Sequence, residues 1–302
     1  MSPRHAAIAT ATALLVVWLA GCGGGPDTKP LVTSGRFVGS TVCAGCHGVA
    51  KTQSRNANGG PEGAFDEWLQ TGHAHAFQTL KDIGQHENPA CTPCHTVGYG
   101  QESGFVSEQE TPHLINVGCE SCHGSGAEHA SDPTANPAAV PLSAEVCGDC
   151  HSGFHHPTAE QWSTSGHAEA LETIQNHPYG QDSCLECHSV DVFLHEFLPG
   201  DPPVLRQANV AQEPITCVLC HDPHSEEYEG QLRTEPAELC IRCHTTGDTL
   251  PGEDPHHPQR EIFLGEGGVD ANGDPLTGPN SPHTNAAALR CIQCHVSEEH
   301  PP

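Results

Sequence analysis

Aromatic residues are scarce in this chain: Phe, Trp and Tyr together make up 5% of its 302 residues. With 35% hydrophobic residues overall, the chain has too little apolar side-chain volume for an ordinary core of this size. Low hydrophobicity combined with a net charge of -27 is typical of disorder. A folded form therefore needs an apolar interior that side chains do not supply.

Basic residues are scarce as well, with 11 Lys and Arg against 38 Asp and Glu. This balance argues against nucleic-acid binding, because Lys and Arg make the phosphate contacts on which such binding depends. It favours partner proteins with basic docking faces and keeps the chain soluble.

The amino terminus has the pattern of a targeting segment. Arg4 precedes an apolar run from Ala6 to Leu19 that is too short for a transmembrane helix. The run ends in Leu19-Ala20-Gly21-Cys22, which resembles the lipobox of bacterial lipoproteins. A plain secretory peptide cleaved nearby is the alternative.

By that resemblance, residues 1–21 are a lipoprotein signal peptide, Cys22 is lipidated, and residues 22–36 form a flexible tether. Gly23 stands where an Asp typically retains lipoproteins at the inner membrane. The prediction is an exported protein on the periplasmic side, anchored by lipid to the outer rather than the inner membrane.

The 16 cysteines other than Cys22 all fall into eight C-x-x-C-H motifs, which we number one to eight in chain order. The motifs are Cys43/Cys46/His47, Cys91/Cys94/His95, Cys119/Cys122/His123, Cys147/Cys150/His151, Cys184/Cys187/His188, Cys217/Cys220/His221, Cys240/Cys243/His244 and Cys291/Cys294/His295. Zinc sites and disulfides also use paired cysteines, but neither demands a histidine directly after every second one.

The motif spacing fits covalent haem attachment. Two thiols three positions apart on one helical turn can both reach the vinyl groups of a single haem. The next residue, His, is then held beneath the iron as proximal ligand. The sequence predicts eight c-type haems, whose macrocycles form the missing interior. The expected fold is mainly α with extensive irregular coil: short helices wrapped around a haem stack, with almost no sheet.

Besides His5 and the eight histidines of the motifs, the chain has 15 more, enough to give every iron a second ligand. Met1 is the one methionine and cleavage removes it, so His/Met ligation is impossible. Imidazole on both sides of the iron lowers its reduction potential relative to Met/His. We therefore expect low-potential haems.

A duplicated segment identifies two of these distal ligands. Trp68-Leu69-Gln70-Thr71-Gly72-His73-Ala74-His75-Ala76 recurs as Trp162-Ser163-Thr164-Ser165-Gly166-His167-Ala168-Glu169-Ala170. Pro157, Thr158 and Gln161 resemble a helix start with a capping box, which predicts a helix that carries His167 on its apolar face. A histidine within such a face, followed by Ala, suits a haem lying flat against the helix. His73 and His167 are thus predicted ligands, the alternative being core histidines that bond a backbone carbonyl.

Six more distal ligands are predicted from their places in the chain. His129 lies six residues after His123, and His224 lies three after His221, so each most plausibly serves a neighbouring haem. One histidine of each adjacent pair, His155/His156 and His256/His257, is expected to ligate. We select His155 and His256, and add His113 and His283.

The repeat also divides the chain. Motifs one to three match motifs four to six, and motifs seven and eight look like a truncated third unit. We expect a first haem module at 37–135, a second at 136–230 and a carboxy-terminal module at 231–302.

From Gly39 to His244 the sequence resembles multihaem c-type cytochromes related to cytochrome c-554 and octahaem hydroxylamine oxidoreductase. The residues that carry the resemblance are the Trp68 and Trp162 segments, Cys91-Thr92-Pro93-Cys94-His95-Thr96-Val97-Gly98, Cys119 through His129, and Cys147-Gly148-Asp149-Cys150-His151. The resemblance implies haems in alternating parallel and perpendicular pairs, a periplasmic location, and a role in respiratory or nitrogen and sulfur electron flow.

The leading functional hypothesis is an electron carrier that passes electrons along low-potential bis-His haems to other redox proteins, with no catalytic residues. The alternative is a reductase or oxidase of small nitrogen or sulfur compounds such as hydroxylamine, nitrite or tetrathionate, with one open haem. Against it, the sequence has no C-x-x-C-K motif, and its last tyrosine is Tyr228. A third hypothesis is an extracellular filament or other oligomer of stacked haems.

Overall fold

The computed structural model describes residues 36–48, 63–197, 212–245, 257–264 and Cys291. The signal peptide, Cys22, the tether, His256, His283, Cys294 and His295 lie outside these ranges. Within them, none of the helices combines the length and apolar character needed to cross a membrane.

The described residues form short helices joined by irregular coil, as the composition predicts. The α-helices are α1 Ser40–His47, α2 Ala64–Trp68, α3 Ala76–Asp82, α4 Thr92–His95, α5 Cys119–His123, α6 Ala127–Ser131, α7 Ala144–Gly148, α8 Thr158–Ser163, α9 Ala170–Asn176, α10 Leu185–His188, α11 Val190–Phe197, α12 Cys217–Cys220, α13 Pro236–Ile241 and α14 Gln259–Leu264. The 3₁₀ helices are η1 Gly72–His75, η2 Pro112–Leu114, η3 Asp182–Cys184 and η5 Glu229–Gln231. Strand pairing in the described ranges is limited to isolated bridges, such as Thr96 with Ile115. The predicted fold class is confirmed.

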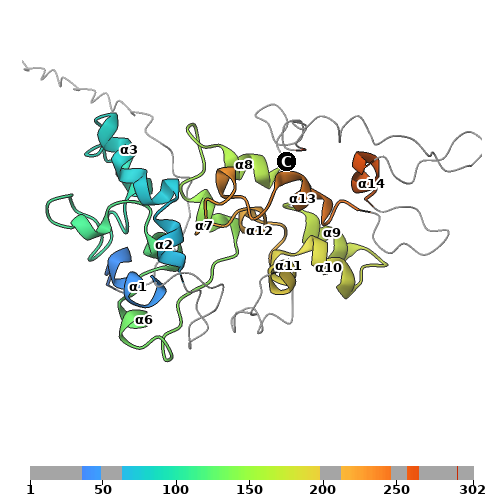
Figure 1. The fold of residues 1–302 in the computed structure, drawn as a ribbon, viewed down its shortest axis with the longest axis horizontal. Coiled ribbons are helices and arrows are strands. Elements are labelled where there is room, and N and C mark those ends of the chain that lie inside the picture. The colour runs from blue at the N-terminus through green and yellow to red at the C-terminus, as the bar shows by residue number, and fades with distance from the viewer. Residues whose placement is uncertain (1–35, 49–62, 198–211, 246–256, 265–290, 292–302) are drawn as a thin grey trace, which may run out of the picture.

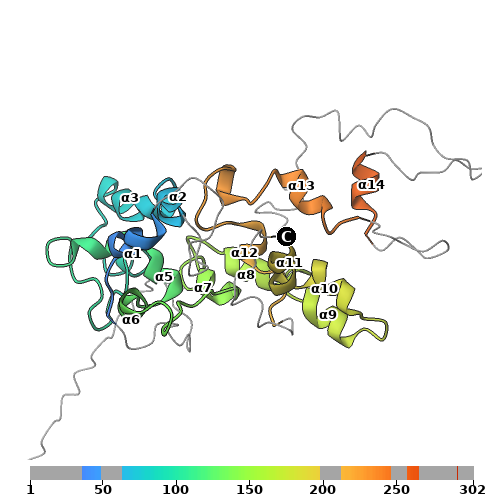
Figure 2. The ribbon, with the colours of Figure 1, turned by 60° about the horizontal axis from the view of Figure 1, so that its bottom comes forward.

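The helices lie along an elongated body (Figure 1). Helices α1, α2, α3 and α6 lie at one end, α7, α8 and α12 in the middle, and α9, α10, α13 and α14 toward the other end. The rotated view keeps the same order (Figure 2). The first and second units are therefore arranged along the long axis.

The duplication predicted from the Trp68 and Trp162 segments has matching contacts in both copies. The indole N–H of Trp68 donates to the carbonyl of Val117 at 3.1 Å, and that of Trp162 donates to the carbonyl of Ile215 at 2.8 Å. Each acceptor lies two residues before the first cysteine of motif three or motif six. The same indole contact thus fixes equivalent motifs in both units.

The prediction of one continuous helix carrying His167 is wrong, because the helix is interrupted and His167 lies in the turns between α8 and α9. Helix α8 ends at Ser163 and α9 begins at Ala170. The Ser165 hydroxyl donates to the carbonyl of Trp162 at 2.7 Å, and in the first copy the Thr71 hydroxyl donates to that of Trp68 at 2.8 Å. Such side-chain bonds compete with the helical hydrogen-bond ladder.

The predicted capping box is also wrong. Pro157 occupies the N-cap of α8, and no side chain caps the helix there. The apolar face that follows His167 does form, because Ala170 and Leu171 of α9 are buried.

Side-chain cores are small, as the low aromatic content predicts. Within the described ranges, one cluster joins Phe37, Phe77, Val97, Phe105 and Leu114, and a second joins Val190, Phe193, Leu194 and Leu219. Neither core extends along the whole body, and the C-x-x-C-H motifs lie in the segments around and between them.

A buried carboxylate fastens the first motif to the third. Glu120 is 2% exposed, although it lies within motif three. Its carboxylate accepts the backbone N–H groups of Val38 at 3.0 Å, Gly39 at 2.7 Å and Gly126 at 2.6 Å. Three donors on one carboxylate satisfy its oxygens and hold the start of α1 against the loop that leads to α6.

Replacing Glu120 with Gln tests this clamp. The amide has one acceptor oxygen where the carboxylate has two, and its NH₂ group meets backbone donors, so the free energy of unfolding is expected to fall by about 2 kcal/mol. Guanidinium denaturation of the haem-loaded protein, followed by far-UV circular dichroism, measures the change.

Glu128→Gln is the matched control, because Glu128 is exposed and its substitution removes the same charge. It should change the free energy of unfolding by less than about 0.5 kcal/mol. Equal effects of the two substitutions would contradict the structural role given to Glu120.

Candidate haem centres

Seven of the eight C-x-x-C-H motifs lie within the described residues, and Cys291 represents the eighth. Each of the seven lies on or at the end of a short helix: α1, α4, α5, α7, α10, α12 or α13. One helical turn between the two cysteines puts both thiols on the same face, which thioether attachment to a single haem requires. All 15 described cysteines are free thiols, so none of them forms the disulfides considered as an alternative.

Cys46 of motif one differs from the other described cysteines in its exposure. It is exposed, whereas the other described cysteines are half-buried. The reason is the placement of α1 at one end of the body: the thiol of Cys43 is hydrogen-bonded to Cys119 of motif three, while Cys46 lies in the last turn of α1, away from that contact. The thioether bond of Cys46 to a haem stays a prediction, for a site at the surface.

Backbone carbonyls set the orientation of four proximal imidazoles. Nδ1 lies 2.6–3.0 Å from the acceptor oxygen in each, in the pairs His95–Ala76, His123–Ala139, His188–Ala170 and His221–Gly230. A carbonyl can only accept, so Nδ1 carries the proton and Nε2 keeps its lone pair for a metal.

Five pairs of histidine rings have centroids 6.0–6.3 Å apart, at interplanar angles from 15° to 70°. Each pair joins a proximal histidine to a histidine outside the motifs: His47–His129, His151–His73, His123–His224, His244–His167 and His188–His257. These pairs bring together residues far apart in the sequence.

The spacing within these pairs fits a shared metal. An imidazole nitrogen binds a first-row metal at about 2 Å. Two imidazoles on opposite sides of one iron therefore have centroids about 6 Å apart. Rings in direct stacking contact lie closer together, so these separations leave room for an iron within each pair.

Burial favours the neutral form of several of these imidazole rings. It lowers the pKa of His73, His123, His151 and His167 below the usual value, because the charged imidazolium is poorly solvated there. A metal ligand must be the neutral imidazole. The same groups thus have both the geometry and the protonation state for axial ligation.

The predicted distal ligands divide into three sets. His73, His129, His167 and His224 each face a proximal ring. His113 instead lies in η2 beside the backbone of Gly39, and the exposed His155 stacks edge-on with Phe154. His256 and His283 lie outside the described residues.

Two histidines that lie close to predicted ligands in the sequence, His75 and His257, show how chain register determines which ring can reach a haem. His75 places Nε2 3.1 Å from the carbonyl oxygen of Leu69, which occupies the nitrogen that a haem iron needs. His257, which we did not select from its pair, faces His188. A recurring His-His-Pro before α8 and before α14 was the signal available in the sequence.

Thiol contacts show which motifs are neighbours. Hydrogen-bonded thiols join Cys43–Cys119, Cys94–Cys150, Cys147–Cys217, Cys187–Cys243 and Cys240–Cys291. Motif one therefore adjoins three, two adjoins four, four adjoins six, five adjoins seven, and seven adjoins eight.

Weaker electrostatic contacts complete this order. The pKa of the Cys150 thiol is raised first by its hydrogen bond with Cys94, then by burial, and to a smaller extent by Cys122 of motif three. The pKa of Cys240 is raised first by burial, then by Cys291, and also by Cys220 of motif six. Motifs three and four are thus neighbours, as are six and seven.

The contacts also place motif eight within the repeat. Cys43–Cys119, Cys147–Cys217 and Cys240–Cys291 each join the first cysteines of two motifs, whereas Cys94–Cys150 and Cys187–Cys243 join second cysteines. Motif eight thus takes the place that motifs three and six hold in their units.

Comparison with known proteins finds matches in both halves of the chain. A family model described as cytochrome c554 and c-prime matches residues 42–124, and one described as a doubled CXXCH motif matches residues 208–249. Cytochrome c-554 of Nitrosomonas europaea is 32% identical over 119 residues, which are 34% of this chain and 45% of that protein. This chain is a multihaem c-type cytochrome.

Two longer matches extend over more of the cytochrome. The C-type polyheme cytochrome OmcC of Geobacter sulfurreducens is 26% identical over 228 residues, 68% of this chain and 26% of that protein. The undecaheme cytochrome from the S-layer of Carboxydothermus ferrireducens superposes with a TM-score of 0.58 at 25% identity, covering 91% of this chain and 53% of that one. This chain thus covers less than half the length of cytochrome c-554 and of OmcC. A relative located in an S-layer agrees with the export that the amino terminus predicts.

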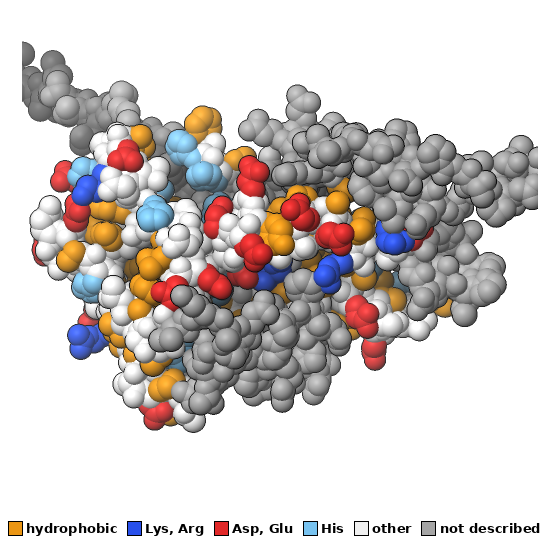
Figure 3. All heavy atoms as spheres, viewed as in Figure 1, with side chains coloured by type: hydrophobic (Ala, Val, Ile, Leu, Met, Phe, Trp, Pro, Cys, Tyr) orange, Lys and Arg blue, Asp and Glu red, His pale blue; other side chains and the backbone are white. Residues whose placement is uncertain are grey.

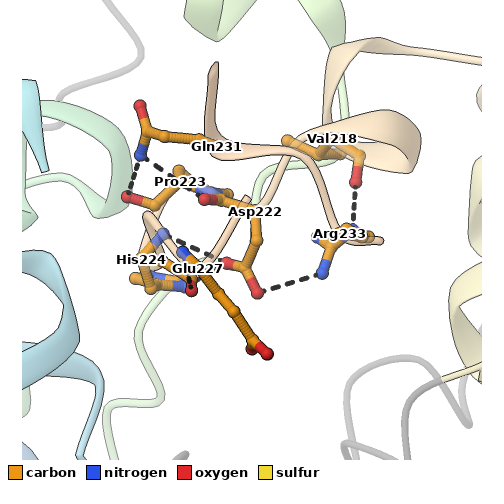
Figure 4. A network of polar contacts seen from close by, with 8 residues as sticks. Val218, Asp222, Pro223, His224, Glu227, Gln231 and Arg233 are labelled. Atoms are coloured by element: carbon orange, nitrogen blue, oxygen red, sulfur yellow. Dashed lines mark hydrogen bonds and ion pairs between the residues drawn. The ribbon is translucent and has the colours of Figure 1, made fainter. Parts of the chain in front are cut away.

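The cytochrome binds c-type haem, and one of its histidines is backed by a carboxylate. Nδ1 of His224 lies 3.3 Å from Oδ1 of Asp222, and the guanidinium of Arg233 lies 3.2 Å from Oδ2 (Figure 4). Burial favours protonated Asp222, but the hydrogen bond with His224 and the Arg233 charge outweigh it and lower the pKa to about 2. Asp222 is therefore ionised and accepts from Nδ1–H, which leaves Nε2 of His224 directed to a metal.

Replacing Asp222 with Asn tests this arrangement. A carboxylate behind an imidazole raises its basicity and stabilises the oxidised metal, so its loss is expected to raise the midpoint potential of one haem. Spectroelectrochemical titration of the haem-loaded protein measures the shift.

Glu227→Gln is the matched control (Figure 4). Glu227 lies in the same loop, and its substitution removes the same charge without removing the carboxylate that contacts Nδ1 of His224. Equal shifts in the two variants would show that only the general field of the carboxylates matters, contrary to the direct role of Asp222.

Proposed function

We propose that the cytochrome is an electron carrier with eight covalently bound haems. Each haem, when bound, supplies an iron that takes up and releases one electron. The observation that carries the proposal is the continuous adjacency of the motifs, in the order one, three, four, six, seven and eight. Motif two adjoins motif four, and motif five adjoins motif seven. An unbroken series of neighbouring sites along an elongated body suits long-range electron transfer.

Axial ligation sets the potential range. The five ring pairs support bis-His coordination at motifs one, three, four, five and seven, by His129, His224, His73, His257 and His167 in that order. His/His ligation gives lower potentials than Met/His ligation. We therefore expect a low-potential carrier rather than a terminal oxidant.

Surface charge supports a basic partner. Asp and Glu side chains gather across the middle of the face seen in Figure 3, where Lys and Arg are few. The pKa of Glu67 is raised, first by partial burial and then by Asp222, Glu227 and Asp66, against the opposing effect of His224. Crowded carboxylates of this kind attract a cationic docking face and raise the association rate at low salt.

A titration tests the carrier function. Coulometric reduction of the mature protein should store eight electrons per chain, one for each motif. In stopped-flow measurements, the reduced protein should transfer electrons to a small cationic cytochrome, at a rate that falls at least about tenfold from low to high ionic strength. Storage of far fewer electrons, or a rate that rises with salt, would contradict the proposal.

The lipid anchor belongs to the same proposal. Cys22 follows Leu-Ala-Gly, and a lipidated Cys22 with the tether to residue 36 would hold the haem modules near a membrane surface. The S-layer location of one relative supports a place outside the cytoplasm.

Replacing Cys22 with Ala is expected to abolish fatty acylation and release the protein in soluble form. Membrane fractionation and intact mass spectrometry measure both effects. Gly23→Asp is the control: it keeps the acylated cysteine and should move the protein to the inner membrane. An unacylated wild-type protein would refute the anchor and favour a plain secretory peptide.

A further inference from the structure

A His-His-Pro sequence occurs twice, each time directly before a helix. His155-His156-Pro157 precedes α8, and His256-His257-Pro258 precedes α14. The first lies in the second unit and the other in the third. Their shared position indicates that the two segments do the same work in successive units.

Backbone and ring contacts confirm this equivalence. The N–H of Ala159 donates to the carbonyl of His151 at 2.9 Å, and that of Arg260 donates to the carbonyl of His244 at 2.7 Å. His156 contacts the His151 ring with centroids 5.5 Å apart, and His257 contacts the His244 ring at 5.4 Å, with interplanar angles of 59° and 70°. His156 is therefore the counterpart of His257.

The third-unit histidine has a second contact that reaches back to the preceding unit. His257 faces the proximal His188 of motif five with centroids 6.3 Å apart, the separation of the other axial pairs. It therefore lies between two motifs, with its own unit's His244 on one side and His188 on the other.

Motif two is the counterpart of motif five in the preceding unit. Nδ1 of His95 bonds the carbonyl of Ala76, and Nδ1 of His188 bonds that of Ala170, both at the start of equivalent helices. The second cysteines of these motifs also make matching contacts, Cys94 with Cys150 and Cys187 with Cys243. His257 of the third unit lies near His188. By this equivalence, we expect its counterpart in the second unit to lie near His95.

We propose that His156 is the distal axial ligand of the haem at motif two, opposite His95. The proposal rests on the haem loading proposed above. It replaces His155, the member of the pair selected from the sequence. Both histidines are exposed, but their ring partners differ: His155 contacts Phe154, which is itself 96% exposed, whereas His156 contacts the proximal His151.

His86 is the rival candidate for motif two. Its Nδ1 is buried without a hydrogen-bond partner, and its ring lies 6.1 Å from Phe77 of α3. The repeat does not favour it, because the register that aligns Ala76 with Ala170 aligns His86 with Gly180. The second unit thus has no histidine at that place.

The first unit differs from the other two at this place. The register that aligns Trp68 with Trp162 puts Pro61 and Glu62 where the second unit has His155 and His156. The assignment therefore rests on the second and third units.

Electron paramagnetic resonance of oxidised, haem-loaded variants tests the assignment. His156→Ala should convert one haem per chain, an eighth of the haem iron, from low spin to high spin relative to wild type. His155→Ala and His86→Ala should leave the spectrum unchanged. Pyridine haemochrome analysis of each sample should give eight haems, which separates loss of a ligand from loss of a haem and hence from failure of the carrier proposal.

His156→Met provides a second test that does not depend on an open iron. It should keep all haems low-spin and raise the midpoint potential of one of them, because Met/His ligation raises the potential above that of His/His. An unchanged spin state in His156→Ala together with unchanged potentials in His156→Met overturns the assignment. Conversion of a haem in His155→Ala or His86→Ala, in place of His156→Ala, also overturns it.

Discussion

The pairing of imidazoles from distant segments is the interaction on which this structure depends. Each of the five observed ring pairs joins a proximal histidine to a segment distant in the sequence, and their centroid separations of 6.0–6.3 Å would accommodate an iron atom bound to both rings. Several pairs cross from one unit to another: His73 of the first unit reaches motif four, and His224 of the second reaches motif three. Each of these two units therefore places a histidine beside a proximal histidine of the other.

This dependence explains the unusual composition. The two side-chain clusters found among the described residues contain five and four residues, too few to order that part of the chain by burial alone. Haem macrocycles held by thioethers and imidazoles supply the missing apolar volume, while carbonyls such as those of Ala76 and Gly230 orient the rings. With its interior supplied by the cofactor, the chain can carry a large excess of acidic residues on a thin, elongated shell.

Much of the site could be predicted from the sequence because its covalent chemistry imposes a fixed local pattern. The C-x-x-C-H motifs predict the proximal ligands, and the duplicated Trp segment predicts His73 and His167, whose rings lie near those of His151 and His244. The break after α8 was missed because it depends on the Ser165 hydroxyl competing for a backbone carbonyl. The choice between His256 and His257 depends on the register of α14, and the role of Glu120 depends on backbone donors distant in the sequence, which local patterns do not reveal.

Folding with and without the cofactor tests this account most directly. The mature polypeptide can be produced with and without the cytochrome c maturation machinery and compared by far-UV circular dichroism and amide hydrogen exchange. The account predicts helical signal and slow exchange only in the haem-loaded chain, with the haem-free chain exchanging like an unfolded polymer. A haem-free chain that keeps its helices and unfolds cooperatively would contradict it.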